Sequence, residues 1–362
     1  MNIAIAGTRG IPANYGGFET FAEELSIRLA ERGHRVTVYC RSNNIRYPER
    51  VYRGVHLVVL PTIPTKHFDT VGHTFLSVFH SLSGRYDVML MCNAANALFT
   101  AVPRLWGVPV ALNVDGIERR RRKWGIAGRT FYRLSEYLAT VLPSAIVTDA
   151  RVMQDYFRDQ LGTESVMIAY GADCTRRTTT AFIESLGLRS REYLLYVSRL
   201  EPENNAHQVI EAYGRVDTRM PLVIVGDAPY ARAYIGRLRA MADARVLFTG
   251  AIYGESCLEL RSHAHAYIQA TEVGGTHPAL LEAMGAGNCI LARDTPEHRE
   301  VLGSTGLYYR DVSGLAGQLE SVLADPRRAE SLRAGTTGRV REHYSWDQIT
   351  DAYEALFASL VP

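Results

Sequence analysis

The stretch Val273–Gly287 combines residue types that suit the binding of an anion and of sugar hydroxyl groups. The pair Gly274–Gly275 lets a ligand approach the main chain closely, and a helix that starts near Pro278 offers free N–H groups to an anion. Thr276 is the expected cap of that helix. Glu282 follows one turn later, where its carboxylate could accept hydrogen bonds from sugar hydroxyls. The alternative is an ordinary strand–loop–helix unit with a surface glutamate, because glycine-rich turns are common.

A second glycine-rich segment, Gly7–Gly17, follows the expected first strand Asn2–Ala6. The dinucleotide-binding spacing G-x-G-x-x-G is absent, because Gly7 and Gly10 are three apart and Gly16 and Gly17 come too late. A long loop that carries a glycine pair fits a mobile lip over a phosphate or an acceptor. A plain connection between a strand and a helix is the alternative.

Asp115 follows the expected strand Val108–Leu112 and is the first candidate for acid–base chemistry. A carboxylate in this place could orient or deprotonate an acceptor hydroxyl, which needs a base within hydrogen-bond reach. Glu118 is the other carboxylate that fits this task. The alternative for Asp115 is a structural one, in which it shapes a turn with Gly116.

Five basic residues, Arg119–Lys123, precede Trp124 and an expected helix that carries aromatic side chains up to Leu138. A basic amphipathic surface with aromatics suits an anionic membrane face or a lipid diphosphate acceptor. The alternative is a solvated charged face. Nucleic acid is not an expected partner, because the formal net charge of the whole chain is only +2.

These candidates depend on an alternation of strands and helices that runs through the chain and predicts doubly wound parallel sheets. We expect an α/β protein with a first Rossmann-like domain at 1–173, a linker at 174–191 and a second Rossmann-like domain at 192–345. A last helix at about 346–360 is expected to pack back on the first domain. A ligand is expected in a cleft between the domains, outside the carboxyl ends of the strands.

Composition excludes several classes of protein. The chain has 362 residues, of which 47% are hydrophobic and 22% charged, as in an ordinary globular protein. Its first residues read as a strand and not as a signal peptide, and no apolar run reaches the ~18 residues of a membrane span. The five cysteines are scattered, which predicts buried thiols in a reducing compartment. We therefore expect a cytoplasmic protein that can also lie peripherally on the inner face of the membrane.

A resemblance to a known family adds to these readings. Gly7–Pro12 with Tyr15–Thr20 resembles the amino-terminal signature of a bacterial rhamnosyltransferase-type subgroup of the family 4 retaining glycosyltransferases, which have the GT-B fold. The similarity continues at Asn113–Glu118, at Arg199–Asn205 and in the stretch Val273–Gly287, so it covers most of the chain. It implies a nucleotide diphosphate sugar (dTDP-, UDP- or GDP-sugar) that is held mainly by the second domain.

The resemblance also assigns individual donor-binding residues. Arg199 matches the family arginine that contacts the diphosphate, by charge-assisted hydrogen bonds. The family's lysine five residues later is here Asn204, so one positive charge is missing. Glu282 matches the second glutamate of the family's E-x7-E pair, which holds the ribose. The first glutamate would lie at Gly274, and Glu272 is either a displaced substitute or unrelated.

Other residues complete the expected site. Main-chain groups of Gly275, Thr276 and His277, together with Arg9, could compensate for the missing lysine, and His277 is expected to support a neighbouring group more than to act itself. The turn that ends the first domain at Asp173 is expected to be structural and could contact the donor, and Tyr253 could border the base. The expected set comprises the catalytic residues Asp115 and Glu118 and the donor-binding residues Arg9, Gly16, Gly17, Arg199, Asn204, Gly274, Gly275, Thr276, His277 and Glu282, with Glu272, Asp173 and Tyr253 in addition.

The family implies front-face substitution, in which the leaving phosphate helps to deprotonate the acceptor and the protein supplies charge stabilisation and positioning. No cofactor is expected, and no metal, because no metal-ligand spacing is present. We expect a hexosyltransferase that moves a deoxyhexose such as rhamnose to a saccharide or lipid-linked acceptor in cell-surface polysaccharide synthesis. A sugar-nucleotide epimerase and a non-catalytic sugar-binding protein are the alternatives.

Overall fold

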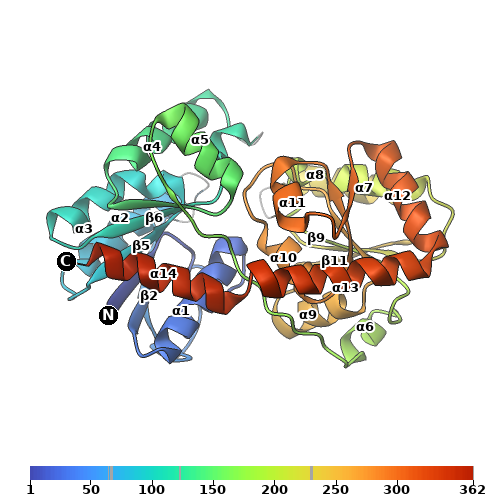
Figure 1. The fold of residues 1–362 in the computed structure, drawn as a ribbon, viewed down its shortest axis with the longest axis horizontal. Coiled ribbons are helices and arrows are strands. Elements are labelled where there is room, and N and C mark those ends of the chain that lie inside the picture. Colours follow the sequence, from blue (N-terminus) through green and yellow to red (C-terminus); the bar gives the residue numbers. More distant parts are fainter. Residues whose placement is uncertain (64, 66–67, 122–123, 229–230, 362) are drawn as a thin grey trace. The chain divides into compact units, whose positions relative to one another are not determined.

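The computed structural model describes residues 1–63, 65, 68–121, 124–228 and 231–361. The chain separates into two compact units (Figure 1). Unit 1 comprises Met1–Tyr170 and Trp346–Pro362, and unit 2 comprises Gly171–Ser345. Each unit is an α/β structure built on its own sheet, as the alternation of strands and helices predicts.

Unit 1 contains an eight-stranded sheet in the order β3-β4-β2-β1-β5-β6-β7-β8. Its strands are β1 (Asn2–Ala6), β2 (Arg35–Arg41), β3 (Val51–Tyr52), β4 (Val55–Leu60), β5 (Val88–Cys92), β6 (Val110–Val114), β7 (Ala145–Thr148) and β8 (Val166–Met167). All neighbouring strands pair in parallel except β3 and β4, which form a short antiparallel pair that the sequence pattern did not indicate. The strands β1, β5 and β6 are almost entirely buried, which explains their continuous apolar sequences.

The helices of unit 1 cover both faces of this sheet. They are α1 (Gly17–Glu31), α2 (Phe68–Ser81), the 3-10 helix η1 (Ala94–Thr100), α3 (Ala101–Leu105), the 3-10 helix η2 (Glu118–Arg120), α4 (Ile126–Val141), α5 (Arg151–Leu161) and α14 (Trp346–Leu360). From β1 to β2 the chain moves toward one edge of the sheet, and from β5 to β8 it moves toward the other edge. Right-handed crossovers therefore place α1 on one face of the sheet and α2, α3, α4 and α5 on the opposite face.

The C-terminal helix α14 packs beside α1 (Figure 1). The guanidinium of Arg32 pairs with Asp351 and Glu354 of α14, and His34 lies 2.6 Å from Glu354. In the interior, the Asn113 side-chain amide donates a hydrogen bond of 2.6 Å to the Tyr353 hydroxyl. This bond ties α14 to β6, the strand that leads to Asp115.

Unit 2 contains a parallel six-stranded sheet in the order β11-β10-β9-β12-β13-β14. The strands are β9 (Leu194–Val197), β10 (Leu222–Val225), β11 (Val246–Gly250), β12 (Ala266–Gln269), β13 (Cys289–Arg293) and β14 (Leu307–Tyr309). The helices are α6 (Ala181–Ser185), the 3-10 helix η3 (Pro202–Asn204), α7 (Ala206–Gly214), α8 (Arg232–Met241), α9 (Gly254–His263), α10 (Pro278–Gly285), α11 (Pro296–Leu302), α12 (Val312–Ala324) and α13 (Pro326–His343).

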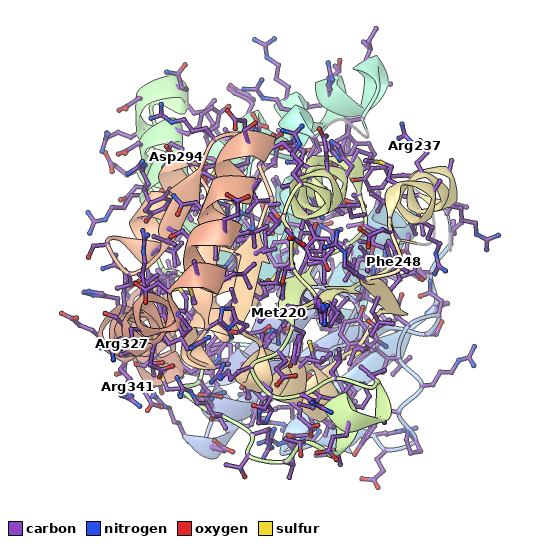
Figure 2. All side chains as sticks on the ribbon, turned by 90° about the vertical axis from the view of Figure 1, so that its right-hand side faces the viewer. Met220, Arg237, Phe248, Asp294, Arg327 and Arg341 are labelled. Carbon is purple, nitrogen blue, oxygen red and sulfur yellow. The ribbon has the colours of Figure 1, made fainter. Side chains whose placement is uncertain are left out.

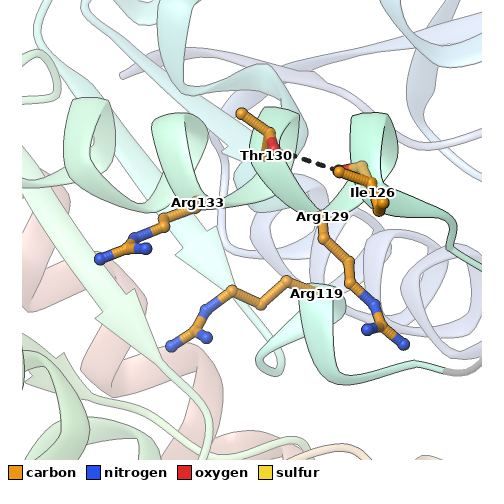
Figure 3. A pocket seen from close by; sticks show the side chains of 5 residues that line it. All are labelled: Arg119, Ile126, Arg129, Thr130 and Arg133. Carbon is orange, nitrogen blue, oxygen red and sulfur yellow. Dashed lines mark hydrogen bonds between the residues drawn. The ribbon is translucent and has the colours of Figure 1, made fainter.

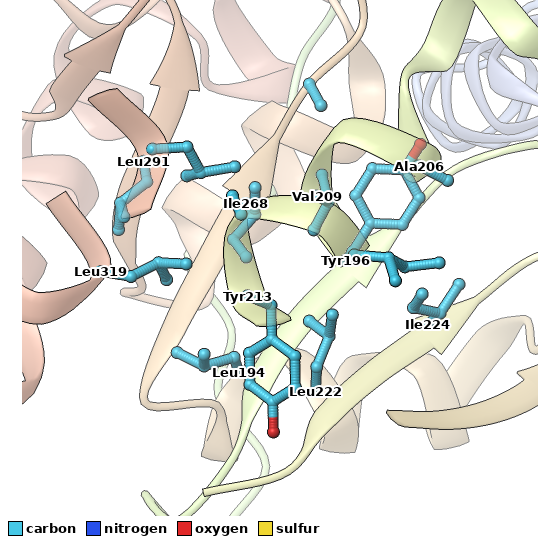
Figure 4. Close-up of a cluster of buried hydrophobic side chains, with 14 of the residues drawn as sticks. Leu194, Tyr196, Ala206, Val209, Tyr213, Leu222, Ile224, Ile268, Leu291 and Leu319 are labelled. Carbon is cyan, nitrogen blue, oxygen red and sulfur yellow. The ribbon is translucent and has the colours of Figure 1, made fainter. Parts of the chain in front are cut away.

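One side of the unit 2 sheet carries a large apolar core under α7, α8 and α12 (Figure 4). Leu194 and Ile268 from adjacent strands pack with Val209 and Tyr213 of α7 and with Leu319 of α12. In contrast to these buried apolar side chains, many basic side chains of unit 2 are exposed, and Figure 2 labels three of them, Arg237, Arg327 and Arg341. The core holds the carboxyl ends of β9 and β12 in place, and the candidate site is built on these ends.

Some connections have a structure of their own. The link between β5 and β6 is a 3-10 helix followed by a short α-helix. Helix α11 begins at Pro296 and is capped by the Thr295 side chain. The segment 174–191, expected as a linker, contains α6.

Within the described part of the chain, we find no helix that has both the length and the apolar character needed to span a bilayer. The five cysteines are free thiols, and all but Cys174 are buried.

The completely buried imidazole of His298 makes the stability of unit 2 depend on pH. Burial lowers the pKa of His298 from 6.5 to about 4, although its Nδ1 bonds to the Arg293 carbonyl oxygen at 2.8 Å. Between pH 6.5 and 4 the unfolded chain binds a proton that the native protein does not, so stability falls as the pH is lowered. We expect this residue to account for a loss of about 3 kcal/mol.

The prediction can be checked by urea unfolding of the wild type and of His298→Phe at pH 7 and pH 4. The variant should lose less stability across this interval, because phenylalanine takes up no proton. Equal losses in the two proteins would contradict the assignment of this pH dependence to His298.

Candidate functional site

In unit 2, the candidate residues come from loops that follow two neighbouring strands. Arg199 follows β9 and the stretch Glu272–His277 follows β12, and these strands pair in parallel at the centre of the sheet. After β9 the chain continues to β10, toward one edge of the sheet, and after β12 it continues to β13, toward the opposite edge. This place is a topological switch point, where ligands of open α/β sheets bind.

The loop after β9 holds Arg199 through its main chain. The Asn204 side-chain amide donates a hydrogen bond of 2.7 Å to the Arg199 carbonyl oxygen, and the Tyr196 hydroxyl donates one of 2.7 Å to the Asn204 carbonyl oxygen. Asn204 is buried, whereas the Arg199 side chain is 32% exposed and lies 3.9 Å from Glu201. Asn204 therefore shapes the loop that presents the guanidinium.

The glycine-rich stretch after β12 is packed against an imidazole. Gly274 has a φ of +155°, and a Cβ atom on it would lie only 2.5 Å from Cε1 of His277. The His277 ring lies 5.1 Å from the ring of His298. Glycine at 274 is thus required both by the backbone conformation and by the neighbouring ring.

Thr276 is not the cap of the following helix, which corrects the expectation from the sequence. The N-cap of α10 is His277, its side chain makes no capping bond, and Pro278 is the first helical residue. The His277 carbonyl oxygen accepts hydrogen bonds from the N–H groups of Leu280 and Leu281. A proline fits the first helical position because its missing N–H group is not needed there, and this places the cap one residue after Thr276.

The Glu282 carboxylate is paired inside the protein. Its Oε2 lies 2.5 Å from Nη2 of Arg261 on α9, and the two side chains are 26% and 11% exposed. Burial favours a lower pKa for Arg261, but Cys257, Glu282 and Tyr267 together raise it, so the guanidinium stays charged. Arg261 therefore fixes the orientation of Glu282 at the second turn of α10.

The other carboxylates of unit 2 stand in different surroundings. Glu272 forms an ion pair of 2.8 Å with Arg293 at the end of β13, and Arg293 also bonds to Gln208 at 2.7 Å. Asp173 has an exposed side chain, and its carbonyl oxygen lies against Gly285, where a Cβ atom would be 2.2 Å away. Tyr253 is 46% exposed and is the N-cap residue of α9.

In unit 1, the loop Gly7–Gly17 connects β1 to α1. The Arg9 main-chain N–H donates to Glu19 Oε1 at 2.8 Å, and its guanidinium lies 3.4 Å from the centre of the Tyr15 ring and 3.7 Å from Asp69. Gly16 is the N-cap residue of α1 and Gly17 its first residue. The first half of the loop is therefore anchored, and the glycine pair lies at the start of a 15-residue helix.

Asp115 and Glu118 follow β6 but differ in their contacts. The half-buried Asp115 lies close enough to Cys92, Tyr132 and Tyr170 that its charge adds to burial in raising the pKa of all three groups. Glu118 pairs with Arg121 and accepts a hydrogen bond of 3.5 Å from Trp124. Both Glu118 oxygens are thus bound within their own loop.

The chain matches two family models. That described as "Glycosyl transferase 4-like domain" matches residues 16–171, and that described as "Glycosyl transferases group 1" matches residues 191–325. Together the two models match most of the chain. The chain belongs to the group 1 glycosyltransferases. It is a nucleotide-sugar-dependent glycosyltransferase of family 4, which retains the configuration of the transferred sugar.

Relatives of this group 1 glycosyltransferase extend over almost its whole length. Glycogen synthase of Mycobacterium tuberculosis is 26% identical over 97% of this chain and 93% of its own. The phosphatidyl-myo-inositol mannosyltransferase of Mycolicibacterium smegmatis is 24% identical over 94% and 90%.

Solved structures show that the fold of this group 1 glycosyltransferase is of the GT-B type. Sucrose-phosphate synthase of Thermosynechococcus elongatus superposes with a TM-score of 0.82 at 17% identity, over 99% of both chains. Anabaena HepE in complex with UDP and glucose superposes with a TM-score of 0.84 at 17% identity, over 99% of this chain and all of the other.

The partners of the site carboxylates in this group 1 glycosyltransferase were not found from its sequence. Arg261, Arg293 and His298 contact Glu282, Glu272 and His277, but each lies 21 residues away along the chain. One local signal is that Arg293 lies at the end of a strand. The identity of its partner could not be predicted, because it depends on the register between β12 and β13.

Replacing Gly274 by alanine is expected to destabilise the protein by about 1–3 kcal/mol and to weaken nucleotide binding, because the new Cβ atom would clash with His277 in a strained backbone conformation. Thermal unfolding and calorimetry with a nucleoside diphosphate check both effects. The matched control is Gly236→Ala in the middle of α8, where no atom lies within 4 Å of the added Cβ atom. That change should stabilise the protein slightly. Equal behaviour of the two variants would contradict the prediction.

Replacing Glu282 by alanine is expected to cost about 3 kcal/mol of stability, because it leaves the buried Arg261 guanidinium without its carboxylate. Arg261→Met combined with Glu282→Leu should be closer to wild type in stability, since both charges are removed together. Chemical unfolding of the three proteins tests this, and additive losses in the double variant would refute the coupling.

Proposed function

We propose that this glycosyltransferase moves a deoxyhexose such as rhamnose from a nucleoside diphosphate to a saccharide or lipid-linked acceptor in cell-surface polysaccharide synthesis. The observation that carries the donor side is the placement of Arg199 and Gly274–His277 after the paired central strands β9 and β12. The choice of rhamnose is supported by the resemblance of Gly7–Thr20 to a rhamnosyltransferase-type subgroup. We assign the acceptor to the domain at 1–173 with helix 346–360, and the donor to the domain at 192–345.

The donor diphosphate is bound by a cation and by main-chain groups. The exposed Arg199 guanidinium donates forked hydrogen bonds to phosphate oxygens, and N–H groups of Gly275, Thr276 and His277 at the start of α10 add to them. Glu282, held by Arg261, accepts hydrogen bonds from the ribose hydroxyls. Support comes from Anabaena HepE, of the same fold, which was solved with UDP-glucose.

The acceptor hydroxyl is oriented by Asp115 after β6. The oxygen of the acceptor hydroxyl attacks the anomeric carbon of the donor sugar from the face that the leaving diphosphate occupies. The bond from that carbon to the phosphate oxygen breaks, and the acceptor proton moves to the departing phosphate. Because attack and departure share one face, the anomeric configuration is retained. The protein contributes positioning and charge stabilisation, which lower the barrier without a covalent intermediate.

The names of two relatives support a glycan or lipid acceptor for this chain. One relative is named for phosphatidyl-myo-inositol, and another is an O-antigen chain mannosyltransferase of Escherichia coli that is 24% identical over 45% of this chain. Both names place the transferred sugar on a component of the cell envelope.

The test incubates the protein with dTDP-rhamnose and with UDP- and GDP-sugars, each with short saccharide and lipid-linked acceptors. We expect release of the nucleoside diphosphate that depends on the acceptor, fastest with dTDP-rhamnose. Turnover without an acceptor would favour an epimerase. No turnover with any donor, together with no binding of nucleoside diphosphates in calorimetry, would remove the proposal.

A further inference from the structure

Helix α4 of unit 1 exposes apolar side chains along one side, which we call the apolar stripe. Ile126, Leu134, Tyr137 and Val141 are 87%, 55%, 60% and 54% exposed, and their spacings of eight, three and four residues place them on one side of the helix. The buried residues Tyr132, Ser135, Glu136 and Ala139 lie on the other side. The stripe therefore points away from the protein core and is not covered within the unit.

Other elements of the same layer of helices also expose large apolar side chains. Helix α4 packs against η1, and α3 follows η1 in the same layer of helices. Leu98 of η1 is 58% exposed, and Leu105 and Trp106 at the end of α3 are 85% and 66% exposed. Exposed leucine and tryptophan side chains that gather on one layer of helices mark a surface that binds another phase or partner.

An arginine-lined pocket lies at the start of α4 (Figure 3). It has a volume of about 480 Å³ and is lined by Arg119, Ile126, Arg129, Thr130 and Arg133. The three guanidinium groups lie on the same side of the helix (Figure 3). Arg119 pairs with Glu136 at 2.9 Å and also bonds to Tyr156, whereas Arg129 and Arg133 form no ion pair with any residue that the structure describes. Two positive charges of the pocket thus remain uncompensated among these residues.

We propose that α4 lies in the interface of an anionic bilayer, with its apolar stripe between the acyl chains and the arginine pocket around a lipid phosphate group. The binding of such helices to membranes depends both on the insertion of apolar side chains and on the attraction between basic side chains and anionic lipids. Either contribution alone gives weak binding. A phosphate group matches the pocket because guanidinium groups bind phosphate oxygens by charge-assisted hydrogen bonds. Trp106 adds a residue type that is enriched at membrane interfaces.

Residues 122–123, which complete the basic run Arg119–Lys123, lie outside the described residues and are not needed for this inference. Only the purpose of membrane binding rests on the proposed function, because a transferase that binds the membrane would meet a lipid-linked acceptor there. The binding itself depends on residues of unit 1, whereas donor binding is assigned to unit 2. The two proposals can therefore fail separately.

The experiment is co-sedimentation of the full-length protein with vesicles of phosphatidylcholine alone and of equal parts phosphatidylcholine and phosphatidylglycerol. We expect binding to the anionic vesicles only. Arg129→Glu with Arg133→Glu should weaken it at least about 30-fold, because each basic residue at an anionic surface contributes about fivefold to partitioning. Leu134→Asp should also weaken binding, because it interrupts the apolar stripe while the arginines remain.

Arg35→Glu with Arg50→Glu is the matched control, because it reverses the same number of charges at exposed positions on other elements of unit 1. This control should stay within about twofold of the wild type in the same assay, because only charges near the surface count. Unfolding temperatures and nucleoside diphosphate binding are measured for every variant, so that loss of fold or of the donor site is recognised.

Three outcomes overturn the inference. Equal binding of wild type and Arg129→Glu/Arg133→Glu to anionic vesicles would remove the pocket and the helix from the contact. Binding of soluble glycerol phosphate that needs Arg129 and Arg133, without binding to vesicles, would assign the pocket to a free phosphate. A dimer in solution that Leu134→Asp dissociates, again without vesicle binding, would assign the stripe to a second copy of the chain.

Discussion

Asp115→Asn is expected to lower kcat by about 10²- to 10⁴-fold, the range over which a positioned acid–base group contributes to a reaction. The asparagine keeps the size of the side chain and its place after β6 but removes the negative charge that, in the proposed mechanism, orients the acceptor hydroxyl. Affinity for nucleoside diphosphates should change little, because the proposed contacts of Arg199 and Glu282 with the donor belong to unit 2. Initial rates at several acceptor concentrations, together with calorimetry, separate the two effects.

The matched control for this variant is Asp159→Asn, an exposed aspartate at the end of α5 that pairs only with its neighbour Arg158. Activity of the control should stay within about twofold, since surface ion pairs contribute little. Glu118→Gln provides a second comparison, because Glu118 is held by Arg121 and Trp124 and is expected to matter for the loop more than for the reaction. If Asp115→Asn keeps wild-type kcat while Glu118→Gln loses it, the roles of the two residues must be exchanged.

Arg199→Ala is expected to reduce kcat/KM about 100-fold while the protein stays folded. The guanidinium is one-third exposed and lies 3.9 Å from Glu201, so we expect its removal to affect the fold less than donor binding. The loss corresponds to one or two charge-assisted hydrogen bonds to the diphosphate, each worth about 1.5–3 kcal/mol. Calorimetry with the nucleoside diphosphate should show a weaker affinity of similar size.

Two further variants sharpen this test. Arg199→Lys keeps the charge but not the planar fork and should fall between wild type and alanine. Arg215→Ala, at the C-cap of α7, removes a partly exposed arginine that pairs with Glu211, and it should leave donor affinity unchanged. Wild-type affinity in Arg199→Ala would exclude this arginine from the donor site.

At position 204, where the family usually has a lysine, the family pattern and the structure give different information. The pattern indicates only that a positive charge is absent. The structure shows that Asn204 is buried and that its amide holds the Arg199 carbonyl oxygen, which is a role in shaping the loop. Because position 204 supplies no charge, we propose that N–H groups at the start of α10 contribute to diphosphate binding in its place.

The sequence by itself determined the class of fold, most of the strands and helices, and the family. Short continuous apolar runs such as Ile3–Ala6 and Leu222–Val225 are typical of buried parallel strands, and helical spacing of apolar residues marks the covering helices. These signals are local, because they depend on residues within one turn of a helix or a few positions of a strand. The motifs of the family are local in the same sense.

Only the tertiary structure decided how the candidate site is supported. The ion pairs of Glu282 with Arg261 and of Glu272 with Arg293, and the contact of His277 with His298, join different elements that the fold brings together. A local pattern cannot predict such pairs, since they depend on the order and register of strands in the sheet and on the rotation of each helix upon it. The same holds for the arginine pocket of α4, because Arg119 reaches it from a different element.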